Sequence, residues 1–153
     1  MLSFAKIDSD RRKYIPLLLE ADEDIAMLDC YLHKGMMFGL YDNGELVTLA
    51  IVLHQEDCVE LMNIVTLDGF RGRGYGSMMI SFLSREFSSS RFLIAGTGDN
   101  SPAREFYKRN GFEEYGRRKD FFLQYDHPVI ENGRRLVDMI LYRKRLQPSS
   151  ILD

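Results

Sequence analysis

The sequence contains few of the residues that build disulfide frameworks or metal sites. It has two cysteines, Cys30 and Cys58, and three histidines. Two cysteines cannot form a framework of several bridges, and their spacing matches no metal-binding motif. Because the sequence has no cluster of cysteine and histidine, we expect no metal site. Unpaired cysteines suit a reducing compartment, so we expect a cytoplasmic protein.

The sequence also lacks long apolar runs and a strong surplus of either charge. Its longest apolar run, LVTLAIVL at residues 46–53, is far too short to span a bilayer, and residues 1–14 lack the apolar core of a signal peptide. Lysine and arginine number 20 against 23 aspartates and glutamates, a net charge of −3. Such a chain has no general attraction to nucleic acid or anionic lipid. We therefore expect neither a nucleic acid nor a membrane as partner.

The length and the local patterns indicate one globular domain of mixed class. A chain of 153 residues can bury one core, and we expect this domain at residues 1–146 and a disordered tail at residues 147–153. The predicted elements run in this order: one or two short helices within 13–35, a hairpin of strands 36–41 and 46–55 around an Asn-Gly turn, a strand at 58–67, a helix at 77–87, a strand at 91–97, a helix at 99–112, a strand and irregular chain at 112–125, and a last strand at 135–146.

This order predicts an α/β fold with a mixed sheet. The strand at 91–97 is apolar on both faces and follows a helix, so we expect it in the centre of the sheet, parallel to the strand at 58–67. The helix at 99–112 has a serine at 101 that can cap its start and a glycine at 111 that can take the left-handed position at its end.

The most informative stretch is RGRGYG at residues 71–76, between an apolar strand and a helix. A helix start after a glycine-rich turn is an anion site, because its free N–H groups and the helix dipole favour negative charge. Glycines let the backbone approach a phosphate closely, and Arg71 and Arg73 add positive charge. A P-loop is excluded because no lysine follows the glycines, and the dinucleotide pattern is excluded because its last glycine would fall on Ser77.

Two motifs resemble the signatures of the GNAT family of N-acetyltransferases. The first is the acetyl-CoA pyrophosphate loop [QR]-x-x-G-x-[GA], with Arg71, Gly74 and Gly76 in the fixed places. Taken by itself it is also compatible with an ordinary glycine turn before a helix. The second motif is N-x-x-A-x-x-x-Y-x-x-x-G-F, carried by Asn100, Ala103, Tyr107, Gly111 and Phe112.

The resemblance implies transfer of an acetyl group from acetyl-CoA to an amine. It implies a central, mostly antiparallel sheet of about seven strands, with a parallel pair at the cofactor cleft and flanking helices. It places the cofactor arm along the strand before the loop, with one backbone N–H polarising the thioester carbonyl, and it makes Asn100 a hydrogen-bond partner of that arm. The residues implied for the arm and the pyrophosphate are Ile64, Val65, Thr66, Arg71, Gly72, Arg73, Gly74, Tyr75, Gly76 and Ser77.

Two proton transfers are needed, and the resemblance suggests a residue for each. Tyr107 matches the family's general acid, although it also shares a helix face with Phe106 and could be a core aromatic. Glu60 matches the catalytic glutamate of the histone-acetyltransferase branch, with an inert surface charge as the alternative. The ribosomal N-terminal branch has its glutamate where this chain has Ala95, which leaves Glu60 or a water relay as base. A nucleophilic Cys58 is disfavoured, so direct transfer in a ternary complex is expected.

The acceptor is less clearly indicated. Acidic residues in the first helices and before the last strand would attract a cationic amine. Candidates are an aminoglycoside-like or polyamine-like small molecule, or a lysine or N-terminus of a protein. A non-catalytic acyl-CoA-binding module and an unrelated nucleotide-binding domain are the rival interpretations. The residues of this acidic and aromatic surroundings, some of which could instead form a homodimer contact, are Glu20, Asp22, Glu23, Asp24, Asp120, Phe121, Phe122, Tyr125, Asp126, His127 and Glu131.

Overall fold

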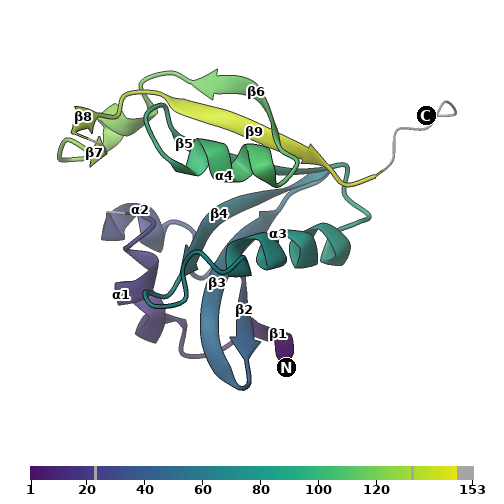
Figure 1. Ribbon diagram of the computed structural model, residues 1–153. Helices are drawn as coiled ribbons and strands as arrows, with labels where there is room; N and C mark the ends of the chain where they lie inside the picture. The colour runs from purple at the N-terminus through teal and green to yellow at the C-terminus, as the bar shows by residue number, and fades with distance from the viewer. Residues whose placement is uncertain (23, 132, 148–153) are drawn as a thin grey trace, which may run out of the picture.

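The computed structural model describes residues 1–22, 24–131 and 133–147, and its centre is a seven-stranded mixed sheet (Figure 1). The strand order is β1-β2-β3-β4-β5-β9-β6, and β7 and β8 form a separate two-stranded sheet. The strands are β1 Leu2–Ile7, β2 Met36–Asp42, β3 Glu45–His54, β4 Cys58–Thr66, β5 Phe92–Gly98, β6 Glu113–Arg118, β7 Ile130–Glu131, β8 Arg134–Arg135 and β9 Met139–Arg145.

Short helices flank this sheet (Figure 1). The α-helices are α1 Ile15–Leu18, α2 Ile25–Asp29, α3 Tyr75–Glu86 and α4 Ala103–Arg109, and the 3-10 helices are η1 Arg11–Tyr14 and η2 Phe121–Gln124. No helix in the described part of the chain is long and apolar enough to cross a membrane.

The fold confirms the expected mixed sheet. β4 and β5 pair in parallel, as predicted, and the other strand pairs are antiparallel. The hairpin of β2 and β3 turns at Asn43 and Gly44, which both have positive φ values, 50° and 83°. Two such residues give the turn that matches the twist of a hairpin, which explains the Asn-Gly signal.

Alternation along the strands divides the core into two layers, one on each face of the sheet. On one face, Phe38, Ala50 and Val52 pack with side chains of α3 and α4. On the other face, Met37 and Ile51 pack with side chains of α1 and α2. The sheet is therefore buried on both faces, and α1 and α2 lie opposite α3 and α4.

Three sequence predictions need correction or stay open. The strand β1 was not predicted, because it is an edge strand whose side chains are mostly exposed and whose apolar spacing is weak. The helices predicted within 13–35 are only four and five residues long, and α2 ends at Asp29 rather than near Gly35. The expected tail lies outside the described residues except for Gln147, and the domain boundaries stay a prediction.

Candidate active site

The site begins where the two parallel strands separate. β4 and β5 are paired through four residue pairs, from Cys58 and Phe92 to Leu61 and Ala95. Just beyond this ladder, β4 carries a bulge against β3, because Val52 pairs with Leu61 while the preceding Ile51 pairs with Asn63. A bulge adds a residue to one strand and bends it. The parts of β4 and β5 beyond the ladder therefore diverge, and two cavities lie along the opening.

The first cavity, here called the cofactor cleft, has a volume of about 510 Å³. Its walls come from β4, the glycine loop, the start of α4 and the end of β5. Most of the residues that the sequence assigned to the cofactor arm and to catalysis gather here. The predicted site residues among those that line it are Ile64, Val65, Thr66, Arg71, Gly76 and Tyr107.

The backbone edge of β4 is the part of the cleft that could hold an extended chain. β4 is paired with β3 on one side as far as Thr66, whereas its ladder with β5 ends at Leu61. The side chain of Val65 packs with α1 and α2, and Ile64 packs from the opposite face. Thr66 Oγ1 lies 2.9 Å from Thr48 Oγ1. An extended ligand can add to a free strand edge through main-chain hydrogen bonds.

The glycine loop places a helix start against this edge. Gly72 and Gly74 have positive φ values of 76° and 85°, which side chains rarely adopt. Met78 N donates to Gly74 O at 3.0 Å as the first bond of α3, so the N–H groups of the preceding residues have no partner within the helix. At Gly76 a Cβ would lie 3.1 Å from the ring of Phe106, so this glycine lets α3 and α4 approach closely.

The polar side chains around the loop hold it in place. Arg71 Nε donates to Thr66 O at 3.0 Å, and Arg71 Nη2 donates to Glu20 Oε1. The guanidinium of Arg73 stacks on the ring of Phe70, 5.5 Å from its centroid. Arg71 is thus held in the wall of the cleft, whereas Arg73 does not line it.

Tyr75 ties the start of α3 to the sheet. Its hydroxyl donates to Asp42 Oδ2 at the end of β2, and this hydrogen bond raises the pKa of Tyr75. Neither Tyr75 nor Ser77 lines the cleft with its side chain, so their expected contribution is through their backbone N–H groups.

Tyr107 is both a core residue and a residue of the cleft. Its side chain is 6% exposed and contacts the rings of Phe106, Phe112 and Tyr142. Burial raises the pKa of Tyr107 to about 12. Its hydroxyl therefore stays protonated at neutral pH and can act only as a proton donor there.

Glu60 lies outside the cofactor cleft, in the wall of the second cavity. It is 8% exposed, and its carboxylate accepts hydrogen bonds from Gln55 Nε2 at 3.2 Å and Arg118 Nη2 at 3.3 Å. The structure therefore places Glu60 and Tyr107 in neighbouring cavities. These cavities share the walls formed by Leu61, Met62, Ala21, Gly96, Thr97 and Glu131.

Neither Cys58 nor Ala95 offers an alternative group. Burial raises the pKa of Cys58, and its thiol donates to Gln55 Oε1 at 3.3 Å, so the thiolate needed for nucleophilic attack is disfavoured. Ala95 is 2% exposed and belongs to the apolar core.

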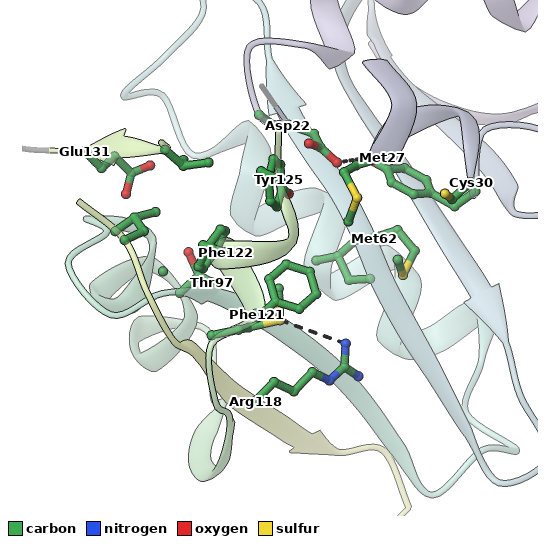
Figure 2. A pocket seen from close by; sticks show the side chains of 18 of the residues that line it. Asp22, Met27, Cys30, Met62, Thr97, Arg118, Phe121, Phe122, Tyr125 and Glu131 are labelled. Carbon is green, nitrogen blue, oxygen red and sulfur yellow. Dashed lines mark hydrogen bonds between the residues drawn. The ribbon is translucent and has the colours of Figure 1, made fainter. Parts of the chain in front are cut away.

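The second cavity, here called the acceptor pocket, has a volume of about 240 Å³. Figure 2 shows its aromatic side, formed by Phe121, Phe122 and Tyr125, facing the sulfur-containing side chains of Met27 and Met62. Three carboxylates, those of Asp22, Glu60 and Glu131, and the guanidinium of Arg118 belong to the described residues that line it.

Not all of the predicted acidic and aromatic residues reach the acceptor pocket. Asp24 accepts from Ala26 N and Met27 N and caps α2. His127 Nδ1 lies 2.7 Å from Asp126 Oδ1 and 3.6 Å from Asp24 Oδ2. These groups hold the segment after η2 against α2 and do not line the pocket.

Asn100 is also outside both cavities. Its Nδ2 donates to Glu131 O at 2.9 Å, and it borders a separate shallow hollow at the start of α4. Its role toward the cofactor arm stays a prediction. The nearby cap is confirmed, since Ser101 Oγ accepts from Ala103 N at 3.1 Å, and Gly111 has a φ of 88° at the end of α4.

Sequence reasoning missed a polar network behind the pocket. Tyr31 Oη donates to Asp22 Oδ2 at 2.9 Å and accepts from Asn63 Nδ2 at 3.1 Å. Burial raises the pKa of Asp22 and that of Tyr31. The available signal was Asn63, a polar residue inside the otherwise apolar run LMNIVTL.

A sheet opened at a parallel pair, with a helix start and a tyrosine in the opening, is the architecture expected of a CoA-dependent acyltransferase. The chain belongs to the GNAT acetyltransferase family: the model of the acetyltransferase (GNAT) domain matches residues 33–114, more than half of its length. Membership confirms the predicted class, since GNAT acyltransferases use acetyl-CoA as cosubstrate. Among curated protein sequences, none matches this chain.

Solved structures of three bacterial acetyltransferases resemble nearly the whole chain. A GNAT family acetyltransferase from Elizabethkingia anophelis, with acetyl-CoA bound, has a TM-score of 0.84 and 26% identity over 94% of this chain and 97% of that one. An acetyltransferase from Bacillus subtilis in complex with CoA has a TM-score of 0.82 and 25% identity over 95% and 99%. An IAA acetyltransferase from Bacillus cereus has a TM-score of 0.83 and 23% identity over 95% and 99%, a likeness of fold.

Proposed function

We propose that the protein transfers an acetyl group from acetyl-CoA to a primary amine directly, in a complex that holds both substrates. The observation that carries the proposal is the opening between β4 and β5, with the cofactor cleft on one side and an acidic, aromatic pocket on the other, sharing walls. Two substrates bound in these cavities would meet at the shared walls, so no covalent enzyme intermediate is needed.

The cofactor cleft fits a phosphorylated thioester. Acetyl-CoA supplies an activated acetyl group, and the chain supplies the groups that bind and orient it. The unpaired edge of β4 at Ile64, Val65 and Thr66 would hold the amide-containing arm through main-chain hydrogen bonds. The free N–H groups at the start of α3, from Gly74 to Ser77, would bind the pyrophosphate together with Arg71.

Two residues would move the protons. An alkyl amine has a pKa of about 10 and must lose a proton before it attacks. Glu60 is assigned as the base, and because it lies in the acceptor pocket and is paired with Arg118, it would receive the proton through water. Tyr107 is assigned as the acid, because its raised pKa keeps a proton on the hydroxyl for the departing thiolate.

The acceptor pocket favours a cationic amine. Of the charged groups that line it in the described chain, three are carboxylates and one is a guanidinium. An excess of negative charge in a narrow cavity raises the local concentration of cations. A protein lysine or N-terminal amine is the second candidate acceptor, and a non-catalytic acyl-CoA-binding module is the alternative without chemistry. The cytoplasmic location and the homodimer stay predictions.

The first test is binding of the cosubstrate. We would measure the melting temperature with acetyl-CoA, CoA, ATP and NAD in parallel, for the wild type, Arg71→Ala and the control Arg85→Ala, an exposed arginine on the same helix. Ligands that bind only the folded state raise the melting temperature. We expect acetyl-CoA and CoA to stabilise the wild type and the control, and we expect roughly tenfold weaker binding in Arg71→Ala, because a charge-assisted contact is lost.

The second part of the test follows thiol release from acetyl-CoA with amine acceptors. Release that depends on the amine supports the transferase. Binding of CoA without release by any amine would favour the non-catalytic module, and stabilisation by ATP or NAD but not by CoA would refute the proposal.

A further inference from the structure

The three carboxylates of the acceptor pocket differ in how they are paired. The Glu60 carboxylate is bound by Arg118 at 3.3 Å and by Gln55 at 3.2 Å. The Asp22 carboxylate accepts from the Tyr31 hydroxyl at 2.9 Å and from Asp24 N at 3.3 Å. Both are therefore already compensated within the protein, in contrast to Glu131.

Glu131 has a buried carboxylate oxygen, Oε2, with no hydrogen-bond partner among the described residues. A buried, unpaired carboxylate oxygen is unfavourable, and in native proteins such a group needs an explanation. Figure 2 shows the Glu131 carboxylate pointing into the space above Phe122 and Thr97. A cationic ligand in that space would supply the missing partner.

Glu131 is also placed where the two substrates would meet. It lines both the acceptor pocket and the cofactor cleft, whereas Asp22 and Glu60 line the pocket only. A cation held by Glu131 is therefore beside the cleft that would hold the thioester. The position is the one required of a group that orients the attacking nitrogen.

The backbone around Glu131 is fixed by contacts from several elements. Its carbonyl accepts from Asn100 Nδ2 at 2.9 Å, and β7 pairs with β8 through Ile130 and Arg135. Behind this hairpin, Leu136 packs so closely on Gly98 that a Cβ there would lie 2.4 Å from Leu136 Cδ1. A carboxylate on a braced segment can hold a ligand in one orientation.

The rest of the pocket limits the size and type of the amine. Its volume of about 240 Å³ is below the roughly 300–1,000 Å³ of pockets that hold drug-sized ligands, too small for an aminoglycoside of several rings. The rings of Phe121, Phe122 and Tyr125 offer apolar area and faces that attract cations. Met27 and Met62 adapt to a ligand's shape because their side chains are flexible.

We propose that Glu131 binds the ammonium group of a small primary amine that carries one ring-sized apolar group, with the ring held by Phe121, Phe122 and Tyr125. The inference rests on the proposed acetyl transfer and names the acceptor class for it. Glu131 is a positioning residue for the acceptor: its carboxylate accepts N–H hydrogen bonds from the ammonium and from the amine left after proton loss. The acceptor is an arylalkylamine rather than an aminoglycoside or a polyamine.

The test compares charged and uncharged amines at saturating acetyl-CoA. Thiol release is measured with phenethylamine, with aniline, which is uncharged at neutral pH, and with spermidine and kanamycin. The proteins are the wild type, Glu131→Gln, Glu131→Asp and the control Glu45→Gln, an exposed glutamate that lines neither cavity. Melting temperature and protection by acetyl-CoA establish that each variant is folded and binds the cosubstrate.

We expect phenethylamine to be the best of the four acceptors. For Glu131→Gln, the kcat/KM for phenethylamine should fall roughly 10- to 100-fold, as for the loss of a charge-assisted hydrogen bond, while the value for aniline changes by less than about threefold. Glu131→Asp should recover part of the loss, and Glu45→Gln should match the wild type.

Three results would overturn this inference while leaving the transferase intact: equal losses for phenethylamine and aniline, no loss in Glu131→Gln, or preference for spermidine or kanamycin. A wild type that binds acetyl-CoA but acetylates none of the four amines also contradicts it. A wild type that does not bind acetyl-CoA refutes the proposed function itself.

Discussion

Replacing Tyr107 by phenylalanine separates the catalytic role of this side chain from its role in the core. Phenylalanine keeps the ring that packs against Phe106, Phe112 and Tyr142. Burial is the cause of the raised Tyr107 pKa, and no hydrogen bond contributes to it. The substitution therefore removes one proton donor from the cleft and leaves the packing in place.

Turnover is the first measurement on Tyr107→Phe. General acid catalysis contributes roughly 10²- to 10⁴-fold to a rate, so kcat should fall by about 10²-fold or more, with little change in the Kd for acetyl-CoA. The control is Tyr115→Phe, because Tyr115 is 41% exposed and lines neither cavity.

Stability at alkaline pH is the second measurement. The folded-state pKa of about 12 for Tyr107 lies above the unfolded value of about 10, so the folded chain keeps a proton that the unfolded chain releases. The free energy of unfolding therefore falls as pH rises from about 10 to about 12, by roughly 2 to 3 kcal/mol from this group. Phenylalanine cannot ionise, so the variant lacks this part of the loss.

Urea unfolding of both proteins at about pH 9 and about pH 11 tests this, because the other titrating groups cancel in the comparison. The wild type should lose about 1 kcal/mol more than the variant over that interval. Equal losses would show that Tyr107 is not buried in solution. A kcat within about threefold of the wild type would remove Tyr107 from the role of general acid.

Two further substitutions test the base and the packing of the opening. Glu60→Gln should lower kcat/KM for the amine by about 10²-fold and abolish the acidic limb of the pH–rate profile, since an amide cannot accept the proton; a limb that persists would assign the base elsewhere. Gly96→Ala would place a Cβ 2.3 Å from Met139 Sδ and should destabilise the protein by about 1–3 kcal/mol in urea unfolding. At Gly116 the nearest side-chain atom would lie 3.6 Å away, so Gly116→Ala should change stability by less than about 1 kcal/mol, and similar effects at the two glycines would contradict the close packing at Gly96.

The elements with local signals could be predicted from the sequence. Asn43 and Gly44 form the predicted hairpin turn, and the glycines of residues 71–76 lie between a strand and a helix start. The parallel pair of β4 and β5 followed from a helix between two apolar strands. These features depend on residues close in the chain, where backbone geometry and side-chain spacing are decisive.

The missed features depend on residues far apart in the sequence. The ion pair of Glu60 with Arg118 joins positions 58 residues apart, and the hydrogen bond of Asn63 with Tyr31 joins positions 32 apart. Glu131 was recognised only as one acid among several, because its position in both cavities depends on the fold of the whole chain. Edge strand β1 escaped because its exposure leaves little apolar pattern.

The short ladder between β4 and β5 makes the opening act like a lever. The pairs from Cys58 and Phe92 to Leu61 and Ala95 form its fulcrum, and Thr66 and Gly98 lie at the ends of its two arms. A small rotation at the fulcrum is magnified along the arms, so the separation of thioester and amine depends on residues that touch neither substrate. Because reactivity is sensitive to displacements of about 1 Å, the packing of apolar side chains around the ladder sets the reach between the two reactants before either one binds.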